Sequence, residues 1–390
     1  MNWFKYFDET ESRNDTFSIK WRGYENTDII PLTVADMDLP TAPAIVEAMT
    51  MRVGHPMYGY SLRTFDPKYN DSILSWWKKR RNIDLKTNWI IYTPGIISAI
   101  TYAIIEFSNE GDGVVIQTPV YDMFKKTINI LERKVVDNPL VFDGENYSID
   151  FLDLEEKLKI AKLMILCSPH NPLGICWSKS DLEKVYALCM KYNVLLISDE
   201  AHSDLIYNKE DFISLLEIDK FDYKNIIITT SIGKTFNCSG LQIANNIIPD
   251  IEIRKRFKHT VYWKFHAVMS SQMANAAVVS AYNEGEEYLD NLVEYLKRNR
   301  DYINNFIVNK LPNIKWSNPS ATYLGWIDCS CLGLKGRELE KFMLESAKIK
   351  INPGDNYGDD SGQFIRLNFA MKYEIIVEVM DRIYKAVSSL

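Results

Sequence analysis

Residues 193–202 read NVLLISDEAH, a run of aliphatic and β-branched residues that ends in two acids. The apolar run Val194–Ser198 predicts a buried strand, and it follows the amphipathic stretch Ser178–Tyr192, where Ser178 can cap a helix. Nearly continuous apolar strands that alternate with helices are typical of a mostly parallel sheet covered on both faces. The stretch therefore predicts an α/β fold in which Asp199 lies at the carboxyl end of a strand.

The same alternation extends outward from about residue 89 to residue 250. Further strands are predicted at Trp89–Thr93, Gly113–Thr118, Lys162–Cys167 and Ile226–Thr230.

Beyond residue 250 the pattern changes to an α+β texture. A long helical stretch, Glu286–Lys310, leads into a region where strand-like and helical runs alternate. The strand-like runs are Thr322–Cys329 and Phe364–Phe369, and the helical runs are Arg337–Lys348 and Lys372–Ser388. We therefore expect a large domain over residues 45–285 and a smaller α+β domain formed by residues 1–44 and 286–390.

Composition indicates an ordinary soluble protein. The chain has 390 residues, 46% hydrophobic and 25% charged, with a net charge of −7. Its nearest approach to a basic cluster, residues 78–81, is expected to be the solvated end of a helix, so we expect no nucleic-acid partner. The longest apolar stretch, residues 96–107, is too short to cross a bilayer, so we expect no membrane partner.

The cysteines and the N-terminus favour a reduced, cytoplasmic compartment. The six cysteines include no C-x-x-C pair, and no histidine pair has zinc spacing, so we expect no metal site. The first fifteen residues are polar and acidic, unlike a secretory signal.

Residues that follow strands are the candidates for function, because open α/β sheets bind ligands outside the carboxyl ends of their strands. DEAH at 199–202 and GKT at 233–235 suggest a nucleotide hydrolase. A phosphate-binding loop needs glycine where Ile228 stands, and the two motifs occur in reverse order. A nucleotide-binding assay would test this alternative. Ser231-Ile-Gly-Lys234 also fits S-x-x-K, but no KTG follows.

The same residues fit pyridoxal 5′-phosphate (PLP) better. This cofactor needs a lysine for a Schiff base, an acid for its pyridinium nitrogen, phosphate donors and an aromatic face. The turn 93–95 precedes an apolar helix, and the free N–H groups at a helix N-terminus suit a phosphate. The candidates are Lys234, Asp199, Gly95, Ile96 and Ile97 with Ser231, Asn171 and Tyr121.

Four segments resemble the fold type I, class I/II aminotransferase superfamily, which is PLP-dependent. They are CSPHNPLG (167–174), ISDEAHSDL (197–205), TTSIGKTFN (229–237) and FIRLNFA (364–370). Other segments resemble its cystathionine β-lyase, or cysteine C–S lyase, branch. They are KW (20–21), PLTVADMDLPTAPAIVEAM (31–49), HPMYGYS (55–61) and AYNEGEEYLDNLVEYLKRN (281–299).

The resemblance implies a role for each residue. Lys234 would carry the Schiff base and act as catalytic base, and Asp199 would face the pyridinium nitrogen. Asn171 would bond the phenolic oxygen, and the catalytic residue Tyr121 would stack on the ring. Arg366 would bind the substrate's α-carboxylate. The phosphate would be held by Gly95, Ile96, Ile97 and Ser231, and by Tyr60 of the neighbouring subunit in a homodimer with shared sites. His202 would pack beneath the cofactor or be a satisfied buried polar residue.

The implied function is a C–S β-lyase that cleaves cystathionine or a related L-cysteine thioether to a thiol, pyruvate and ammonia. An aminotransferase acting on an amino acid and a 2-oxo acid is the alternative, and a regulatory protein that retains PLP is a distant one. Thr33 and Leu39 stand where the branch commonly has Trp and Phe, which leaves the preferred substrate open.

Overall fold

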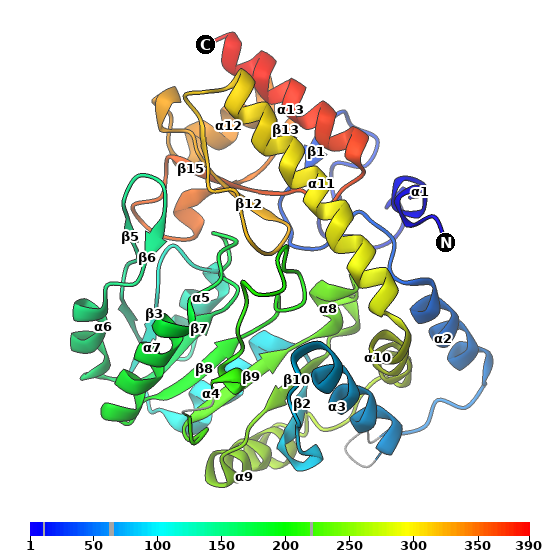
Figure 1. Cartoon of the computed structure of the whole chain (residues 1–390), viewed down its shortest axis with the longest axis vertical. Coiled ribbons are helices and arrows are strands. Elements are labelled where there is room, and N and C mark those ends of the chain that lie inside the picture. The colour runs from blue at the N-terminus through cyan, green and yellow to red at the C-terminus, as the bar shows by residue number, and fades with distance from the viewer. Residues whose placement is uncertain (11, 62–65, 219–220) are drawn as a thin grey trace.

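The computed structural model describes residues 1–10, 12–61, 66–218 and 221–390. Its centre is a seven-stranded sheet in the order β2-β10-β9-β8-β7-β3-β4 (Figure 1). Strand β10 runs antiparallel to its neighbours β2 and β9, and the other pairs are parallel. The prediction of a mostly parallel sheet in an α/β fold is confirmed. The strands are β2 (Ile90–Thr93), β3 (Gly113–Ile116), β4 (Lys134–Asp137), β7 (Ala161–Cys167), β8 (Leu195–Asp199), β9 (Ile226–Thr230) and β10 (Ala244–Ile247).

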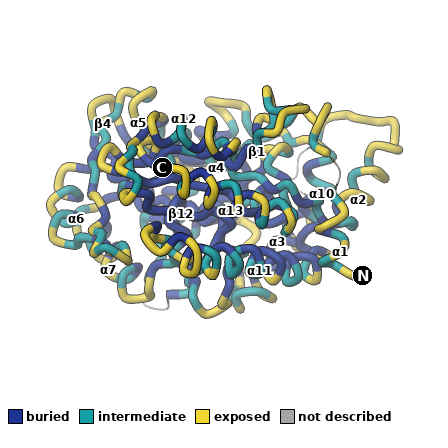
Figure 2. Tube along the Cα trace, turned by 90° about the horizontal axis from the view of Figure 1, so that it is seen from above, coloured by how far each residue is buried: buried dark blue, intermediate teal, exposed yellow. Residues whose placement is uncertain are grey.

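Helices cover the sheet on both faces. Successive residues of a strand point to opposite faces, so each strand contributes apolar side chains to both layers of helices. In β8, Leu195 and Ile197 belong to a hydrophobic cluster with helices α4, α5 and α9, whereas Leu196 belongs to a second cluster with α6 and α7. Figure 2 shows this buried centre between more exposed helices. The helices are α4 (Ile96–Phe107), α5 (Asp122–Ile130), α6 (Phe151–Leu158), α7 (Lys179–Lys191) and α9 (Ile251–His259).

A second region is built around the long helix α11 (Glu286–Lys310), which runs from α10 (Gln272–Glu284) to the C-terminal helices in Figure 1. Beside it lies a four-stranded antiparallel sheet, in the order β11-β12-β15-β14. Its strands are β11 (Lys315–Trp316), β12 (Leu324–Asp328), β14 (Asn352–Pro353) and β15 (Phe364–Asn368), and the helices are α12 (Gly336–Ser346) and α13 (Tyr373–Ser388).

The N-terminal residues pack on this second region. The Phe7 ring, in α1 (Trp3–Asp8), lies 5.1 Å from that of Tyr295 in α11. Strand β1 (Ile30–Pro31) pairs in parallel with β13 (Ile349–Lys350). These contacts support the proposed division into residues 45–285 and residues 1–44 with 286–390.

Two strands of the main sheet, β4 and β10, were not predicted. Strand β10 has the sequence ANNI, and its two asparagines are fully buried. Asn246 Nδ2 donates to the carbonyl of Ile91 at 2.8 Å, and Asn245 Oδ1 accepts from Tyr69 Oη at 2.7 Å. The two asparagines interrupt the apolar run from which a buried strand is predicted. Tertiary hydrogen bonds pair these polar atoms and allow them to be buried.

The basic run 78–81 ends helix α3 (Pro67–Arg81), as predicted. Within the described part of the chain, every helix is too short or too polar to span a membrane.

Candidate active site

Lys234 lies in the short helix α8 (Ile232–Thr235), directly after β9. Its Nζ atom donates to the backbone carbonyl of Ala35 at 2.5 Å, and the same carbonyl accepts from Tyr323 Oη at 2.9 Å. Ala35 belongs to an irregular segment, residues 33–39, which we call the N-terminal strap. The lysine is thus fixed between the sheet and a strap that comes from the start of the chain.

Burial lowers the pKa of Lys234 to about 8. Among its charged neighbours, Asp36 and Asp199 favour the ammonium form, whereas Arg366 disfavours it. A free lysine has a pKa of about 10.4, so this amine is neutral far more often near neutral pH. A neutral amine is the form that a nucleophile or a base requires.

Asp199 is the last residue of β8 and is only 7% exposed. Its Oδ1 atom accepts from the backbone N–H of Ala201 at 3.0 Å. Burial raises the pKa of this carboxyl to about 6, although the Ala201 N–H and Lys234 favour the carboxylate. A buried carboxylate with so little compensation is suited to a cationic ligand group.

Arg366 and Asn171 lie in contact although they are 195 residues apart. Arg366 comes from β15, and its Nη1 atom donates to Oδ1 of Asn171 at 3.2 Å. Its Nη2 atom donates to the Thr33 carbonyl, and its guanidinium lies 5.1 Å from the ring centre of Tyr357. The buried Nε atom has no hydrogen-bond partner among the described residues. This donor is available to an anion.

The first turn of α4 offers backbone N–H groups. Gly95 precedes this helix with φ +99°, a conformation in which a side chain would be strained. The N–H groups of Ile96 and Ile97 belong to the first helical turn, which has no intrahelical acceptor for them. They are therefore suited to a phosphate.

Ser231 acts as a helix cap in this structure. Its Oγ atom accepts from the Gly233 N–H at 2.9 Å and donates to the Ile243 carbonyl at 2.5 Å. Its contact with a phosphate stays a prediction and would require the hydroxyl to turn.

Tyr121 and His202 complete the group. Burial raises the pKa of Tyr121 to about 12; Asp122 and Asp199 add to this rise, whereas the charge of Arg366 opposes it. Burial lowers the pKa of His202 to about 3, and Lys234 and Arg366 lower it further. His202 is therefore a neutral imidazole, and it packs edge-on against Tyr323 with the ring centres 5.8 Å apart.

Tyr60 stands apart from the other candidates. It is 95% exposed, and its loop is held to α10 by Gln272, which donates to the Gly59 carbonyl at 2.5 Å. None of the contacts found among the described residues joins Tyr60 to Lys234. The structure thus brings together Lys234, Asp199 and His202 from the strand ends with Asn171 and Arg366, and leaves Tyr60 on the surface.

Sequence reasoning linked only Thr33 and Leu39 of the N-terminal strap to substrate preference, and gave no role to the strap's carbonyls or to Tyr323. The strap supplies the carbonyls of Thr33 and Ala35 to Arg366 and Lys234. A signal was present, because Asp36 and Asp38 interrupt an apolar stretch. No His, Cys, Asp and Glu cluster of metal-site size occurs within the ranges that the structure describes.

Residues 27–383 match the family described as aminotransferase class I and II, so the chain belongs to this family. Cystathionine beta-lyase PatB of Bacillus subtilis (strain 168) is 36% identical over 98% of this chain and 100% of its own length.

Two solved structures extend the comparison. A PLP-bound putative aminotransferase from Clostridium difficile 630 has a TM-score of 0.93 and 36% identity, and the match covers 98% of this chain and 99% of the other. Cystalysin from Treponema denticola, which contains a pyridoxal 5′-phosphate cofactor, has a TM-score of 0.93 and 32% identity over 98% of each chain. These likenesses leave no support for the nucleotide-hydrolase alternative.

Proposed function

We propose that this protein is a PLP-dependent C–S β-lyase that cleaves cystathionine or a related L-cysteine thioether to a thiol, pyruvate and ammonia. The observation that carries the proposal is the convergence of Lys234, Asp199, Asn171 and Arg366 from separate parts of the chain on one buried site. The relatives named as cystathionine beta-lyase and cystalysin give the reaction type.

The residues fit PLP. Lys234 would hold the cofactor through Nζ, and its lowered pKa suits that bond. Asp199 would pair with the pyridinium nitrogen and gain the cationic partner that its burial calls for. Asn171 would bond the phenolic oxygen, Tyr121 would cover the ring and His202 would lie against it. The phosphate would be bound by Gly95, Ile96, Ile97 and Ser231.

When bound, PLP supplies an electron sink that stabilises negative charge at the substrate Cα. The protein supplies binding and proton transfer. Arg366 binds the α-carboxylate through a guanidinium that Thr33 and Asn171 already hold in place. Lys234 would take the Cα proton through Nζ, because burial keeps much of its amine neutral near pH 8. Departure of the thiolate from Cβ and addition of water then give thiol, pyruvate and ammonia.

The assembly is a homodimer in which Tyr60 completes the neighbouring subunit's phosphate site. Its 95% exposure beside the exposed Met57 and Tyr58 supports an interface at this loop. A cytoplasmic location is also proposed, and the six free cysteines support it.

Product analysis tests the reaction. Purified protein is incubated with cystathionine, with and without a 2-oxo acid, and Lys234→Ala is the matched control. Pyruvate, ammonia and free thiol formed without the 2-oxo acid, and absent with Lys234→Ala, support the lyase. Turnover that requires a 2-oxo acid and yields a new amino acid identifies an aminotransferase instead, the alternative that the Clostridium difficile relative favours. Bound PLP without either reaction would favour a regulatory protein.

A further inference from the structure

The N-terminal strap, residues 33–39, is held to the active site through its backbone. Two asparagine side chains from other parts of the chain donate to its carbonyls. Asn368 donates to the carbonyls of Val34 at 2.7 Å and Asp36 at 2.5 Å. Asn237, three residues after Lys234, donates to those of Met37 at 2.9 Å and Leu39 at 2.8 Å. These bonds fix the path of the strap without using its acidic side chains.

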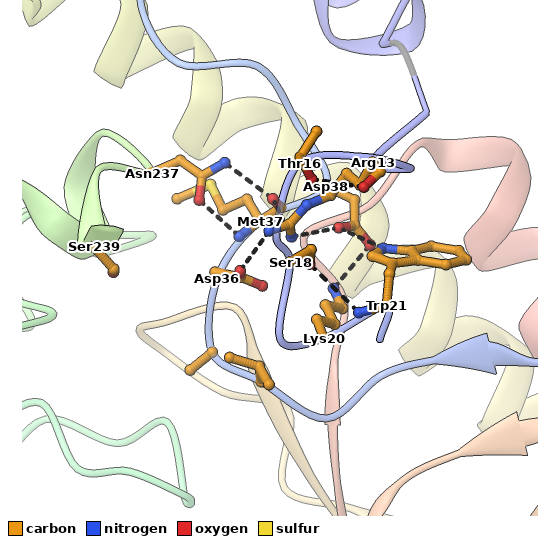
Figure 3. A network of polar contacts seen from close by, with 12 residues as sticks. Arg13, Thr16, Ser18, Lys20, Trp21, Asp36, Met37, Asp38, Asn237 and Ser239 are labelled. Carbon is orange, nitrogen blue, oxygen red and sulfur yellow. Dashed lines mark hydrogen bonds and ion pairs between the residues drawn. The ribbon is translucent and has the colours of Figure 1, made fainter. Parts of the chain in front are cut away.

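The acidic side chains of the strap are held by the preceding part of the chain. Figure 3 shows Arg13 bridging both of them, 2.8 Å from Asp36 Oδ2 and 2.8 Å from Asp38 Oδ1. The fully buried Lys20 lies 2.9 Å from Asp38 Oδ2, and Trp21 Nε1 donates to Asp38 Oδ1 at 3.1 Å. The cluster contains two cations and two anions and is therefore electrically balanced.

The two carboxylates differ in what they face. Both carboxylate oxygens of Asp38 have a cationic partner. Burial favours the neutral acid, but Lys20 and Arg13 hold the pKa of this carboxyl below its usual range. Asp36 uses only Oδ2 for Arg13. Its Oδ1 atom is buried and has no hydrogen-bond partner in the described ranges. Asp36 is also the charged neighbour that most favours the ammonium form of Lys234.

We propose that Asp36, held in place by Arg13, is a positioning residue for Lys234. Its carboxylate sets the charge environment of the lysine, which the strap covers. This inference rests on the proposed role of Lys234 and goes beyond it, since it assigns a function to residues outside the cofactor and substrate set. Other groups also face Lys234: Asp199 from β8, Arg366 from β15, His202, and Tyr323, which donates to the same Ala35 carbonyl.

The two members of the pair should have opposite effects on Lys234. Asp36→Asn removes the carboxylate but keeps the strap, because its carbonyls stay bound and Arg13 still pairs with Asp38. The lysine then loses its favourable charge, and its titration midpoint should fall by about one pH unit. Arg13→Ala removes a cation and leaves Asp36 without its ion-pair partner. It also loosens the packing of the strap over Lys234, so the titration midpoint of the lysine should rise. Arg13→Lys keeps the charge and should restore most of the original value.

The test measures Lys234 without using turnover, so its failure is separate from failure of the proposed reaction. Full-length protein freed of cofactor is pulse-labelled with acetic anhydride across a pH series, and mass spectrometry of the Lys234 peptide gives the midpoint. Arg80→Ala is the matched control, because Arg80 is likewise an arginine with two acidic partners, tying α3 to α11 at 2.8 Å from Asp290 and 3.6 Å from Glu286. It should lower the melting temperature comparably to Arg13→Ala and leave the midpoint unchanged.

A lowered midpoint for Asp36→Asn with a raised midpoint for Arg13→Ala supports the proposal. An unchanged or raised midpoint for Asp36→Asn overturns it, as does an Arg80→Ala shift equal to that of Arg13→Ala. Both of those results would mean that the cluster only stabilises the fold.

Discussion

The Nη1 atom of Arg366 lies 3.2 Å from Oδ1 of Asn171, and this hydrogen bond joins the proposed substrate site to the proposed cofactor site. Arg366 belongs to the antiparallel sheet of the second region, whereas Asn171 follows β7 of the main sheet. A change at either residue should therefore affect both cofactor binding and substrate binding.

Replacing Arg366 should weaken binding of every substrate, because the α-carboxylate is common to all of them. Arg366→Ala should lower kcat/KM for cystathionine and for a simple S-alkyl cysteine alike, by about ten- to a hundredfold, the value of one charged hydrogen bond. Arg300→Ala is a control, since Arg300 also lies over a tyrosine ring, 4.3 Å from the centre of Tyr207. A loss confined to one substrate would contradict the assignment.

Asp199 should destabilise the protein without cofactor and yet strengthen the binding of PLP. Burial raises its pKa to about 6, so in the protein without cofactor its contribution to stability is lost as the pH rises from about 4 through 6. Asp199→Asn should therefore raise the free energy of unfolding of that form at pH 8 and give no gain at pH 4. The same variant should bind PLP more weakly.

Urea unfolding at the two pH values, with PLP titration, checks the Asp199 prediction. The fully exposed Asp143 serves as control, because backbone N–H groups of Asn146 and Glu145 hold its pKa below the usual range. Asp143→Asn should give no gain at pH 8. An Asp199→Asn protein with unchanged PLP affinity would show that another acid faces the ring.

Tyr60 should act on the neighbouring subunit. Mixing inactive Lys234→Ala with an inactive Tyr60→Phe variant should restore part of the activity, because one site of each mixed dimer keeps both residues intact. Tyr384→Phe, a change on α13 at another exposed tyrosine, should stay active alone. Proven subunit exchange without recovery would count against a shared site.

His202 should make the protein acid-sensitive. Burial holds its pKa at about 3, so its contribution to stability is lost as the pH falls from the unfolded value of about 6.5 through 3. His202→Phe should reduce the slope of unfolding free energy against pH in this window by up to about 1.4 kcal/mol per pH unit. The exposed His55 is the control. An unchanged slope in His202→Phe would mean that the imidazole is charged in the folded state.

The sequence by itself determined five of the seven strands of the main sheet and the residues at the ends of those strands. The run 194–198 forms β8 within one residue, and α11 has the predicted bounds Glu286–Lys310. Both predictions succeeded because apolar periodicity and strand-end position are local properties. Asp199 and Lys234 could be proposed for the same reason, since each follows such a strand.

Only the tertiary structure decided how the chain ends complete the site. The pairing of Ala35 with Lys234 spans 199 residues, and that of Arg366 with Thr33 spans 333. A backbone carbonyl has no sequence signature, so no local pattern marks Ala35 as an acceptor. The pKa of Lys234 likewise depends on burial by distant segments and on the charge of Asp36, which exist only once the chain has folded.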